Sequence, residues 1–530
     1  MKCSPIVEKN GSENAFGGRK GRSVTEALII LKLVQDHAHW GNHPLIIKFL
    51  DVKKFFDSMN FRKSLVEIYK SGIRGKYWIN YKVMNEYKKC IPYTELGDCV
   101  PLDVNEVFVQ GSSDAVLMAW NVIDRINKKK GDIFDPMFLV EGIHIPRLLF
   151  VDDIAEFVRS NDDLNCSNIV NEVFEKENRI EFKLSKCKIM RINCPDDKIS
   201  MLNGVELQET VEHKYLGTVI SPKGREKDID VRISESMGVL HEIVEICKSN
   251  ELSVWRLKYV IMLMKSCFDS KIKFGCEVWG RLKEKQKKLL NNLKPRLMKQ
   301  VLAIPYSTPS LAIQHDFGLI DLDLDIEGET LIAFVEVYKL PENRIIKRLL
   351  MSMMRQEIPG YCAYVKTLMD KFDFSEINDM LIVPDIRKEI KKRIVDIQRK
   401  LLFSKMLEAS KTDGMLLNFK FDGTQQQYLK VLPFKKAQAI FRFRSRMFLT
   451  KLNFPGRWNS LRCIHCGNID SDEHIFNCTG YDDLMIEGLD YKWVYTLEGD
   501  IQKLYERAEV LQKIYERMEI LQEMTTTSNE

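Results

Sequence analysis

The sequence predicts an α+β protein in which a region of mixed strands and helices is followed by a longer, mostly helical region. Short apolar runs alternate with helix-like segments over the first 220 residues, as expected for a sheet covered by helices. Helical periodicity dominates after Gly224, with breaks near Pro341, Pro359 and Pro384. A compact group of cysteine and histidine near the C-terminus indicates a small metal-bound module.

The first region contains the clearest strand and hairpin signals. Leu45–Asp51 is a continuous apolar run of strand length and is predicted to be a buried strand. Two apolar runs, Met137–Val140 and Ile143–Phe150, flank Glu141-Gly142, which predicts a hairpin. Further strands are predicted at 188–192 and 215–221, and helices at 60–72, 77–87, 116–126 and 168–177.

Length and composition limit the class of protein. A chain of 530 residues corresponds to roughly three to four domains. Apolar residues make up 45% and charged residues 29%, which favours a soluble globular protein and excludes a disordered one. No apolar run is long enough to cross a bilayer and no signal-peptide pattern is present, so we expect an intracellular protein with no membrane partner.

Positive charge is concentrated in one stretch. Gly423–Ile469 has nine basic residues and no Asp or Glu, so the rest of a chain of net charge +5 is mildly acidic. Aromatic residues alternate with these cations, and stacking combined with phosphate contact is how single strands are held without sequence readout. A helix with a packed aromatic face and a solvated basic face explains the same pattern, and the two interpretations are compatible. The predicted nucleic-acid-binding residues are Lys435, Lys436, Arg442, Arg444, Arg446 and Arg457.

Four potential metal ligands follow within the same part of the chain. Cys463, Cys466, His474 and Cys478 have the spacing C-x₂-C-x₇-H-x₃-C. Three thiolates and one imidazole suit a tetrahedral structural Zn²⁺ site. His465 lies between two of the ligands and is interpreted as a bystander, and unrelated buried cysteines are the alternative.

Acidic side chains occupy two strand ends in the first region. Asp51 ends an apolar strand, and Asp152-Asp153 follow an apolar run about 100 residues later. Adjacent carboxylates at the tip of an apolar hairpin are costly unless a cation neutralises them. Mg²⁺ prefers carboxylate oxygens, and a pair of such ions can hold both reacting oxygens of a phosphoryl transfer. The alternative is an Asp-Asp pair that only caps a turn.

Six segments resemble, in their order along the chain, motifs of the reverse transcriptases of non-LTR (LINE-type) retrotransposons. The segments are FGGRKGRSVTEAL from Phe16 (fingers), FLDVKKFFDSMN from Phe49 (first palm motif), VFVQGSS from Val107 (Gln-Gly motif), LLFVDDIAEF from Leu148 (catalytic hairpin), EFKLSKCKIM from Glu181 (conserved-Lys motif) and HKYLGTVIS from His213 (primer-grip hairpin). Downstream, CFDSKIKFGCEVWG resembles the family's thumb and RFRSRMFLTKLNFPGRWNSLRCIHCG its basic and zinc-knuckle segment. The resemblance covers roughly residues 13–480.

The resemblance implies a right-hand polymerase with an antiparallel palm sheet and a helical thumb, followed by a mostly helical region and a small zinc knuckle. The domains implied are partial fingers and palm at 1–222, a thumb at 223–310, a helical connector at 311–422, the basic segment with its CCHC knuckle at 423–485 and a helical tail at 486–530.

The activity implied is RNA-directed DNA polymerisation, with two Mg²⁺ ions assisting nucleotidyl transfer onto a primer 3′-OH. The partners implied are an RNA template, a DNA primer or target and deoxynucleoside triphosphates, in a nuclear or cytoplasmic ribonucleoprotein. Asp51 and Asp152 would be metal ligands, Asp153 a supporting carboxylate and Lys186 the general acid for the leaving pyrophosphate. The nucleotide-binding residues implied are Arg19, Arg22, Phe56, Gln110 and Gly111.

Two other interpretations remain open. A retroelement-derived nucleic-acid-binding protein without polymerase activity is favoured by the substituted Gln-Gly motif, where Val109 and Ser112 replace the family's usual Arg and Asp. The retained Asp51, Asp152 and Asp153 oppose it. A group II intron maturase or a telomerase-like enzyme is the second alternative, and the thumb and knuckle resemblance argues against it.

Overall fold

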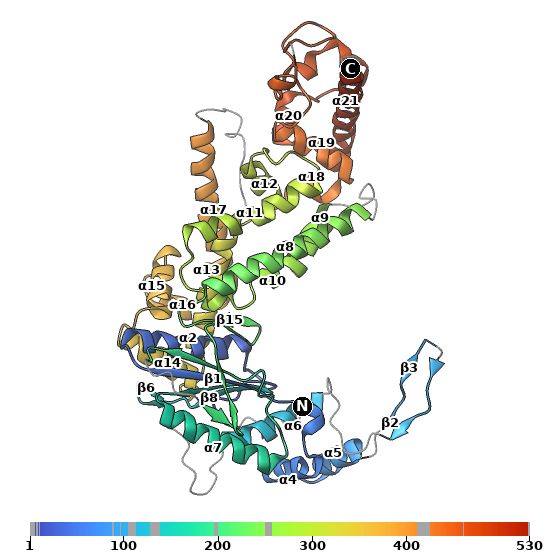
Figure 1. Ribbon diagram of the computed structural model, residues 1–530. Helices are drawn as coiled ribbons and strands as arrows, with labels where there is room; N and C mark the ends of the chain where they lie inside the picture. Colours follow the sequence, from blue (N-terminus) through green and yellow to red (C-terminus); the bar gives the residue numbers. More distant parts are fainter. Residues whose placement is uncertain are drawn as a thin grey trace. The chain divides into compact units, whose positions relative to one another are not determined.

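The chain forms two compact units (Figure 1). The computed structural model describes residues 6, 9, 11–86, 89–95, 97–103, 113–127, 138–194, 200–249, 257–410, 424–458 and 460–527. Unit 1 comprises Met1–Ile229, Gly275–Arg281 and Thr330–Ile382, and unit 2 comprises Asp230–Phe274, Leu282–Glu329 and Val383–Glu530. Unit 1 includes Thr330–Ile382, a segment that the sequence analysis assigns to the helical connector. The expected domain limits stay a prediction.

A five-stranded sheet forms the centre of unit 1. Its order is β13 (Gln208–Glu209), β10 (Lys188–Ile192), β1 (Leu45–Asp51), β9 (Asp153–Val158) and β8 (Arg147–Phe150). β1 runs antiparallel to both β10 and β9, and β8 runs antiparallel to β9. The strands predicted at 45–51 and 188–192 are confirmed, and the sheet places them side by side in the middle.

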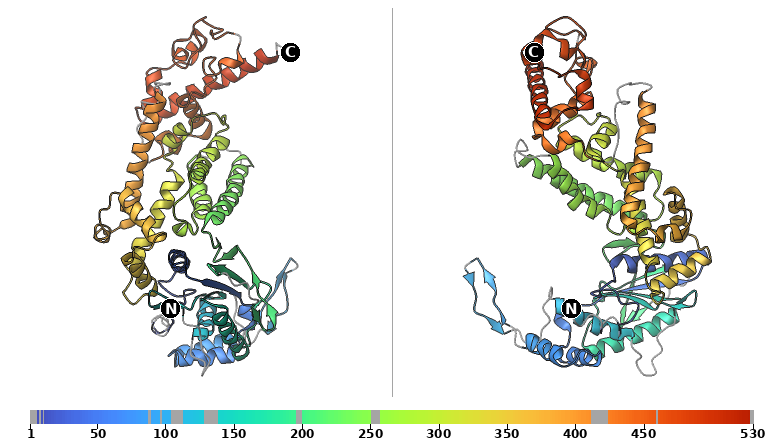
Figure 2. Two further views of the ribbon diagram at one scale, coloured as in Figure 1. Left: turned by 60° about the vertical axis from the view of Figure 1, so that its left-hand side comes forward. Right: turned by 180° about the vertical axis from the view of Figure 1, so that it is seen from behind.

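Helices cover both faces of this sheet. Figures 1 and 2 show α2 (Val24–Trp40) on one side and α7 (Asn161–Asn178) on the other. Ser23 caps α2 by accepting a hydrogen bond from the Glu26 N–H, and Ser160 caps α7 by accepting one from the Asp163 N–H. Because of this cap, α7 begins seven residues before the predicted start at 168. The other helices of the N-terminal part include α4 (Phe61–Lys70), α5 (Lys76–Glu86) and α6 (Ser113–Ile123).

Two tight turns organise the smaller hairpins. Glu141 and Gly142 both have positive φ, 52° and 74°, as a two-residue hairpin turn requires. They join β6 (Leu139–Val140) to β7 (Ile143–His144), which confirms the predicted hairpin. The single strand predicted at 215–221 is wrong: Leu216 and Gly217 turn the chain between β14 (His213–Tyr215) and β15 (Thr218–Ile220). A Leu-Gly turn lacks the Asn or Asp that usually marks this geometry in a sequence.

The remaining elements are mostly helical. The helices of the second half include α8 (Glu226–Ser249), α9 (Leu257–Leu263), α11 (Glu284–Val301), α12 (Ser310–Phe317), α13 (Leu322–Tyr338), α17 (Ile386–Ser410), α18 (Gln427–Val431), α19 (Phe434–Arg444), α20 (Tyr491–Thr496) and α21 (Ile501–Thr527). None of the helices in the described ranges has the length and apolar character that a bilayer span requires.

A buried ion network crosses the sheet beneath its α7 face. Lys48, Glu156 and Arg147 lie opposite one another on β1, β9 and β8, and each is at most 1% exposed. Glu156 lies 2.7 Å from the Lys48 ammonium and 3.0 Å from the Arg147 guanidinium. Burial opposes ionisation of Glu156, but these two cations outweigh it and lower its pKa to about 2. The charge of Lys48, in the centre of the otherwise apolar strand β1, is thus neutralised by Glu156.

Replacing Glu156 by Gln should cost about 3–5 kcal/mol of unfolding free energy at pH 7, because two buried cations lose their counter-charge. The folded pKa of Glu156, about 2, lies below its ordinary value of 4.5. Its ionisation therefore contributes stability above pH 4.5, and this contribution is lost as the pH falls towards 2. Urea unfolding of both proteins between pH 7 and pH 3 should show the gap narrowing. A gap that does not depend on pH would contradict this account.

Candidate functional sites

Three carboxylates gather at one end of the central sheet. Asp51 is the last residue of β1 and pairs directly with Asp153, the first residue of β9. Asp152 lies in the turn that joins β8 to β9, next to Val151. Val151 has φ 60°, a conformation that is costly for a β-branched residue and is held only where the surroundings enforce it. The turn places Asp152 next to Asp153, the residue that pairs with Asp51.

The electrostatics of this cluster disfavour three free charges. Burial, and then repulsion from Asp152 and Asp51, raises the pKa of Asp153 to about 6. Burial also raises the pKa of Asp152, and Asp51 adds to this effect. A carboxylate donor set that is partly buried and mutually repulsive is suited to a hard divalent cation such as Mg²⁺, which prefers oxygen ligands.

Lys186 reaches the cluster from the chain segment that follows α7. Its ammonium donates a hydrogen bond of 2.9 Å to Asp51 Oδ2, and this bond raises the pKa of Lys186. The segment is held in place by backbone pairing, since Lys183 N donates to the Asp51 carbonyl at 2.8 Å and Val52 bridges to Phe182. Lys186, the predicted general acid, therefore lies beside Asp51, one of the predicted metal ligands.

The β14–β15 hairpin lies on the same face of the sheet as Asp51. Side chains alternate along a strand, so Phe49 and Asp51 share a face. His213 stacks on Phe49 with ring centroids 4.1 Å apart, and Tyr215 lies 5.5 Å from the same ring. The hairpin that resembles a primer grip is therefore adjacent to the carboxylates.

Three of the predicted nucleotide-binding residues stay untested. Phe56 lies in the short helix α3 (Phe55–Ser58), half-buried and in edge-to-face contact with Phe55 at 5.7 Å. Contact with a nucleotide sugar remains a prediction for this ring. Gln110 and Gly111 lie outside the described residues.

The prediction that Arg19 and Arg22 bind the triphosphate is not supported by their surroundings. Arg19 is 5% exposed, donates to the carbonyls of Ser12 and Ala15, and lies over the Trp120 ring at 5.4 Å. Arg22 has a side chain 3% exposed and forms an ion pair of 2.9 Å with Glu13. Both guanidinium groups brace the N-terminal segment internally. The sequence from Phe16 to Arg22 does not indicate that Arg19 and Arg22 bind the residues just before them in the chain.

Gly17 is a residue that the sequence reasoning missed. The segment before it runs along β8, with Phe16 N donating to the Leu149 carbonyl at 2.8 Å. A Cβ at Gly17 would lie 2.6 Å from the backbone nitrogen of Val151, so no larger residue fits without displacing the Asp152 turn. The Gly-Gly pair after Phe16 was the available signal.

The four predicted zinc ligands converge in unit 2. Their donor atoms all lie within 4.8 Å of one another. The Sγ atoms of Cys463 and Cys478 are 3.6 Å apart, those of Cys478 and Cys466 3.9 Å, and Cys466 Sγ lies 3.4 Å from His474 Nε2. Ligands at about 2.3 Å from a tetrahedral Zn²⁺ would be separated by about 3.8 Å. The donor set and its spacing therefore fit zinc.

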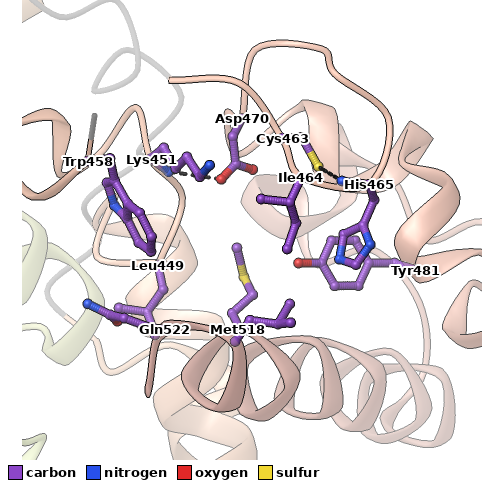
Figure 3. Close-up of a pocket in the computed structure, with 11 residues that line it drawn as sticks. Leu449, Lys451, Trp458, Cys463, Ile464, His465, Asp470, Tyr481, Met518 and Gln522 are labelled. Carbon is purple, nitrogen blue, oxygen red and sulfur yellow. Dashed lines mark hydrogen bonds between the residues drawn. The ribbon is translucent and has the colours of Figure 1, made fainter. Parts of the chain in front are cut away.

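Backbone hydrogen bonds shape the turn that carries the first two ligands. Cys463 N donates to the Asn468 carbonyl at 2.7 Å and Gly467 N to the Cys463 carbonyl at 3.0 Å. Gly467 has φ 75°, which glycine adopts without strain. The His465 ring lies beside Tyr481 with ring centroids 5.9 Å apart (Figure 3), and His465 is not among the four residues whose donor atoms cluster, which agrees with its interpretation as a bystander.

Removing zinc should unfold the knuckle locally. Ligand binding and folding are coupled at such sites, because three thiolates cannot stay this close without a cation. We expect a chelator to release one zinc per chain and to increase hydrogen exchange within 461–481, while exchange in the central sheet of unit 1 stays unchanged. Cys466→Ser should reproduce the effect without chelator. Full exchange protection in a chain shown to be metal-free would contradict the assignment.

Arg444, one of the predicted nucleic-acid-binding residues, is buried and bonded to several helices of unit 2. Arg444 is 2% exposed and forms a two-pronged ion pair with Asp316 at 2.8 and 2.9 Å. Its remaining donors bind the carbonyls of Val494 and Tyr495, each at 2.9 Å. Tyr428 donates to the same Asp316 carboxylate at 2.6 Å. The Arg444 guanidinium therefore ties α12, α18, α19 and α20 together. Contact of Arg444 with nucleic acid stays a prediction that this burial does not favour.

Two other predicted cations pack against α21. Lys436 forms an ion pair of 3.0 Å with Glu509 and lies 4.4 Å from the Tyr505 ring. Arg442 lies 4.3 Å from the Tyr515 ring. The aromatic face is core, since Phe441, Phe443 and Phe448 are each 0% exposed. The predicted cations that stay exposed are Lys435 and Arg457, with Arg446 half-buried.

A small pocket lies between the knuckle and α21 (Figure 3). Its apolar floor comes from Leu449, Ile464 and Met518. Trp458 forms one wall, with the Lys451 ammonium 5.2 Å from its ring. Lys451 N also donates to Asp470 Oδ2 at 3.1 Å, which fixes the turn that carries this lysine. Trp458 and Lys451 thus combine an aromatic ring with a cation at this pocket. The aromatic residues of α19, in contrast, are buried in the core.

Comparison with known proteins supports the interpretation of unit 1. Residues 2–220 match the family model described as reverse transcriptase (RNA-dependent DNA polymerase). No curated protein gives a significant match to the chain. The matched segment contains the carboxylate cluster and Lys186, so the sheet, the site and the family match together support a reverse transcriptase domain in this part of the chain.

Proposed function

We propose that the protein is the RNA-directed DNA polymerase of a non-LTR retrotransposon and adds deoxynucleotides to a primer 3′-OH. The observation that carries this proposal is the convergence of Asp51, Asp152 and Asp153 at one end of the sheet, inside the segment that matches the reverse transcriptase family. The resemblance of the thumb and knuckle segments favours the non-LTR class.

The chain's own groups have defined roles in this reaction. Asp51 and Asp152 would hold a pair of Mg²⁺ ions, with Asp153 in support, and the metal would supply charge stabilisation at the reacting phosphate. Lys186 stays protonated beside Asp51, because the hydrogen bond to Asp51 raises its pKa. It can therefore give a proton to the leaving pyrophosphate. Gly17 leaves room for the Asp152 turn, because a Cβ at this position would lie 2.6 Å from Val151 N.

Nucleic acid is held by the remaining exposed cations and by the knuckle. Lys435 and Arg457 are exposed and carry over from the predicted set. Cys463, Cys466, His474 and Cys478 would hold a Zn²⁺ ion that keeps the knuckle folded. The adjacent pocket presents Trp458 and Lys451. The partners proposed are an RNA template, a DNA primer or target and deoxynucleoside triphosphates, in a nuclear or cytoplasmic ribonucleoprotein.

A specific observation favours a second candidate, a nucleic-acid-binding protein without polymerase activity. Arg19 and Arg22 are engaged internally and the Gln-Gly motif is substituted, so the usual triphosphate contacts are reduced. The intact carboxylate cluster with Lys186 argues for catalysis.

Primer extension separates the two candidates. The full chain is incubated with Mg²⁺, dTTP and oligo(dT) annealed to poly(rA). The polymerase proposal predicts extension that EDTA abolishes. Tight binding of the annealed substrate without extension, in protein whose zinc content is stoichiometric, would favour the second candidate.

A further inference from the structure

Tyr215, the last residue of β14, buries a hydroxyl that makes no hydrogen bond. The residue is 2% exposed, and its hydroxyl has no partner among the described residues. A buried polar group without a partner costs free energy, so its presence calls for an explanation. Burial, together with the charge of Asp153, raises the pKa of Tyr215 well above its ordinary value. The hydroxyl therefore keeps its proton and can donate it to an acceptor.

Asp153 is the member of the carboxylate cluster that lacks a donor. The Asp51 carboxylate accepts a hydrogen bond from Lys186 at 2.9 Å, and the Asp152 carboxylate accepts one from its own backbone N–H. In the part of the chain that the structure describes, no group donates to the carboxylate of Asp153. Asp153 thus offers the acceptor that Tyr215 lacks.

The sheet places both groups on one face. Asp51 and Asp153 stand opposite each other on β1 and β9, as do Phe49 and Ala155, so these four side chains share a face. The Tyr215 ring lies on the same face, with its centroid 5.5 Å from that of Phe49. Asp153 is the member of the cluster whose charge acts on the Tyr215 hydroxyl. The unpaired donor and the unpaired acceptor therefore belong to one site.

The hairpin that carries Tyr215 is anchored on its far strand. Thr218 Oγ1 donates to the Tyr215 carbonyl at 3.1 Å, and Val219 N donates to Asp228 Oδ1 at 2.8 Å. A Cβ at Gly275 would lie 2.5 Å from the Thr218 methyl carbon, so another segment of unit 1 packs closely against the hairpin. A side chain on such a support can hold a neighbouring carboxylate in one orientation.

We propose that Tyr215 is a positioning residue whose hydroxyl donates a hydrogen bond to the Asp153 carboxylate and so orients it for metal binding. Groups that bond to the ligands of a metal hold these ligands in place and strengthen metal binding. This role rests on the proposed function, which supplies the metal. It is distinct from contact with a primer, which the resemblance of the hairpin implies. The alternative is a ring that only packs on Phe49.

The test is Mn²⁺ binding by the full-length, zinc-loaded protein without nucleic acid or nucleotide, followed by the electron paramagnetic resonance signal of free Mn²⁺. Asp152→Asn identifies the cluster, because its loss of binding marks the Mn²⁺ held there. Tyr215→Phe keeps the ring and should weaken this binding about 10- to 100-fold, the usual effect of removing a group that orients a metal ligand. Equal affinity in Tyr215→Phe and the unmodified protein would overturn the proposal.

The matched control is Tyr361→Phe. Tyr361 is 1% exposed, and its hydroxyl also has no partner among the described residues. It lies at the start of α15 (Tyr361–Lys371), where its backbone N–H donates to Asp36 of α2 at 2.8 Å. The control should bind Mn²⁺ like the unmodified protein, and a loss equal to that of Tyr215→Phe would contradict a specific role for Tyr215.

Two further measurements separate orientation of Asp153 from a general effect on the fold. Adding Tyr215→Phe to Asp153→Asn should not weaken Mn²⁺ binding further, whereas losses that multiply would show that Tyr215 acts elsewhere. Without metal, Tyr215→Phe should melt no lower than the unmodified protein, because it loses a buried hydroxyl that has no partner. A clearly lower melting temperature would make Tyr215 a structural residue and contradict the proposal.

Primer extension by the same preparations keeps the two proposals apart. Tyr215→Phe should need more Mg²⁺ to reach its half-maximal rate and should approach the unmodified rate when Mg²⁺ saturates. An inactive unmodified protein that still shows the difference in Mn²⁺ binding would refute only the polymerase proposal. An active protein in which Tyr215→Phe changes neither metal measurement would refute only the role of Tyr215.

Discussion

Replacing Asp152 by Asn is expected to abolish primer extension while leaving nucleic-acid binding close to that of the unmodified protein. The change removes one charged metal ligand from a cluster in which Asp51 and Asp153 face each other across β1 and β9. Metal-assisted charge stabilisation is worth several kcal/mol at the transition state, and its loss corresponds to at least about 10³-fold in rate. Asn keeps the size of the side chain, so the turn at Val151 should keep its shape.

The matched control is Asp162→Asn, which removes an exposed carboxylate from the first turn of α7 in the same unit. Rates of dTTP incorporation are measured for both variants, together with equilibrium binding of the primer–template. The control should extend primers at the rate of the unmodified protein. Extension by Asp152→Asn within tenfold of that rate would remove Asp152 from the catalytic centre.

Replacing Arg444 by Met should destabilise the C-terminal part of unit 2 by about 3–5 kcal/mol, because Asp316 is left as a buried charge without its partner. Burial disfavours the Asp316 carboxylate, yet Arg444 and His315 outweigh it and hold its pKa well below the ordinary value. Hydrogen exchange of α18, α19 and α20 measures the loss, since Arg444 and Asp316 connect these helices.

Two variants give this prediction its controls. Arg457→Met removes an exposed cation and should change stability by no more than about 0.5 kcal/mol. Combining Asp316→Asn with Arg444→Met should cost less than the sum of the single changes, because the second change removes the charge that the first leaves unpaired. Additive effects, or a loss below about 1 kcal/mol for Arg444→Met, would show that the buried pair does not hold these helices together.

Much of the site could be predicted because its residues stand at places that a sequence marks. Asp51 ends the apolar run of β1, and Asp152-Asp153 follow a second apolar run, so the strand ends and the acids coincide. The zinc ligands were predictable for a similar reason, since two of them lie on one turn and all four within a short polar stretch. Both the carboxylate site and the zinc site could therefore be predicted from residues that lie close together in the sequence or at the ends of apolar runs.

The direction in which long side chains point was not predictable. Arg19 and Arg444 look like surface cations in the sequence, but their partners, the carbonyl of Ala15 and the carboxylate of Asp316, are set by tertiary packing. The absence of acids within 423–469 was misleading, because the counter-charge for Arg444 comes from more than 100 residues upstream.

The central claim is that this chain copies RNA into DNA at the Asp51–Asp152–Asp153 cluster. The most direct measurement is the sequence of the product made on an RNA template of mixed sequence, with a short DNA primer, four deoxynucleoside triphosphates and Mg²⁺. The account predicts DNA complementary to the RNA over the extended length, made by the unmodified protein and not by Asp152→Asn. Products unrelated to the template, or the same products from Asp152→Asn, would contradict it.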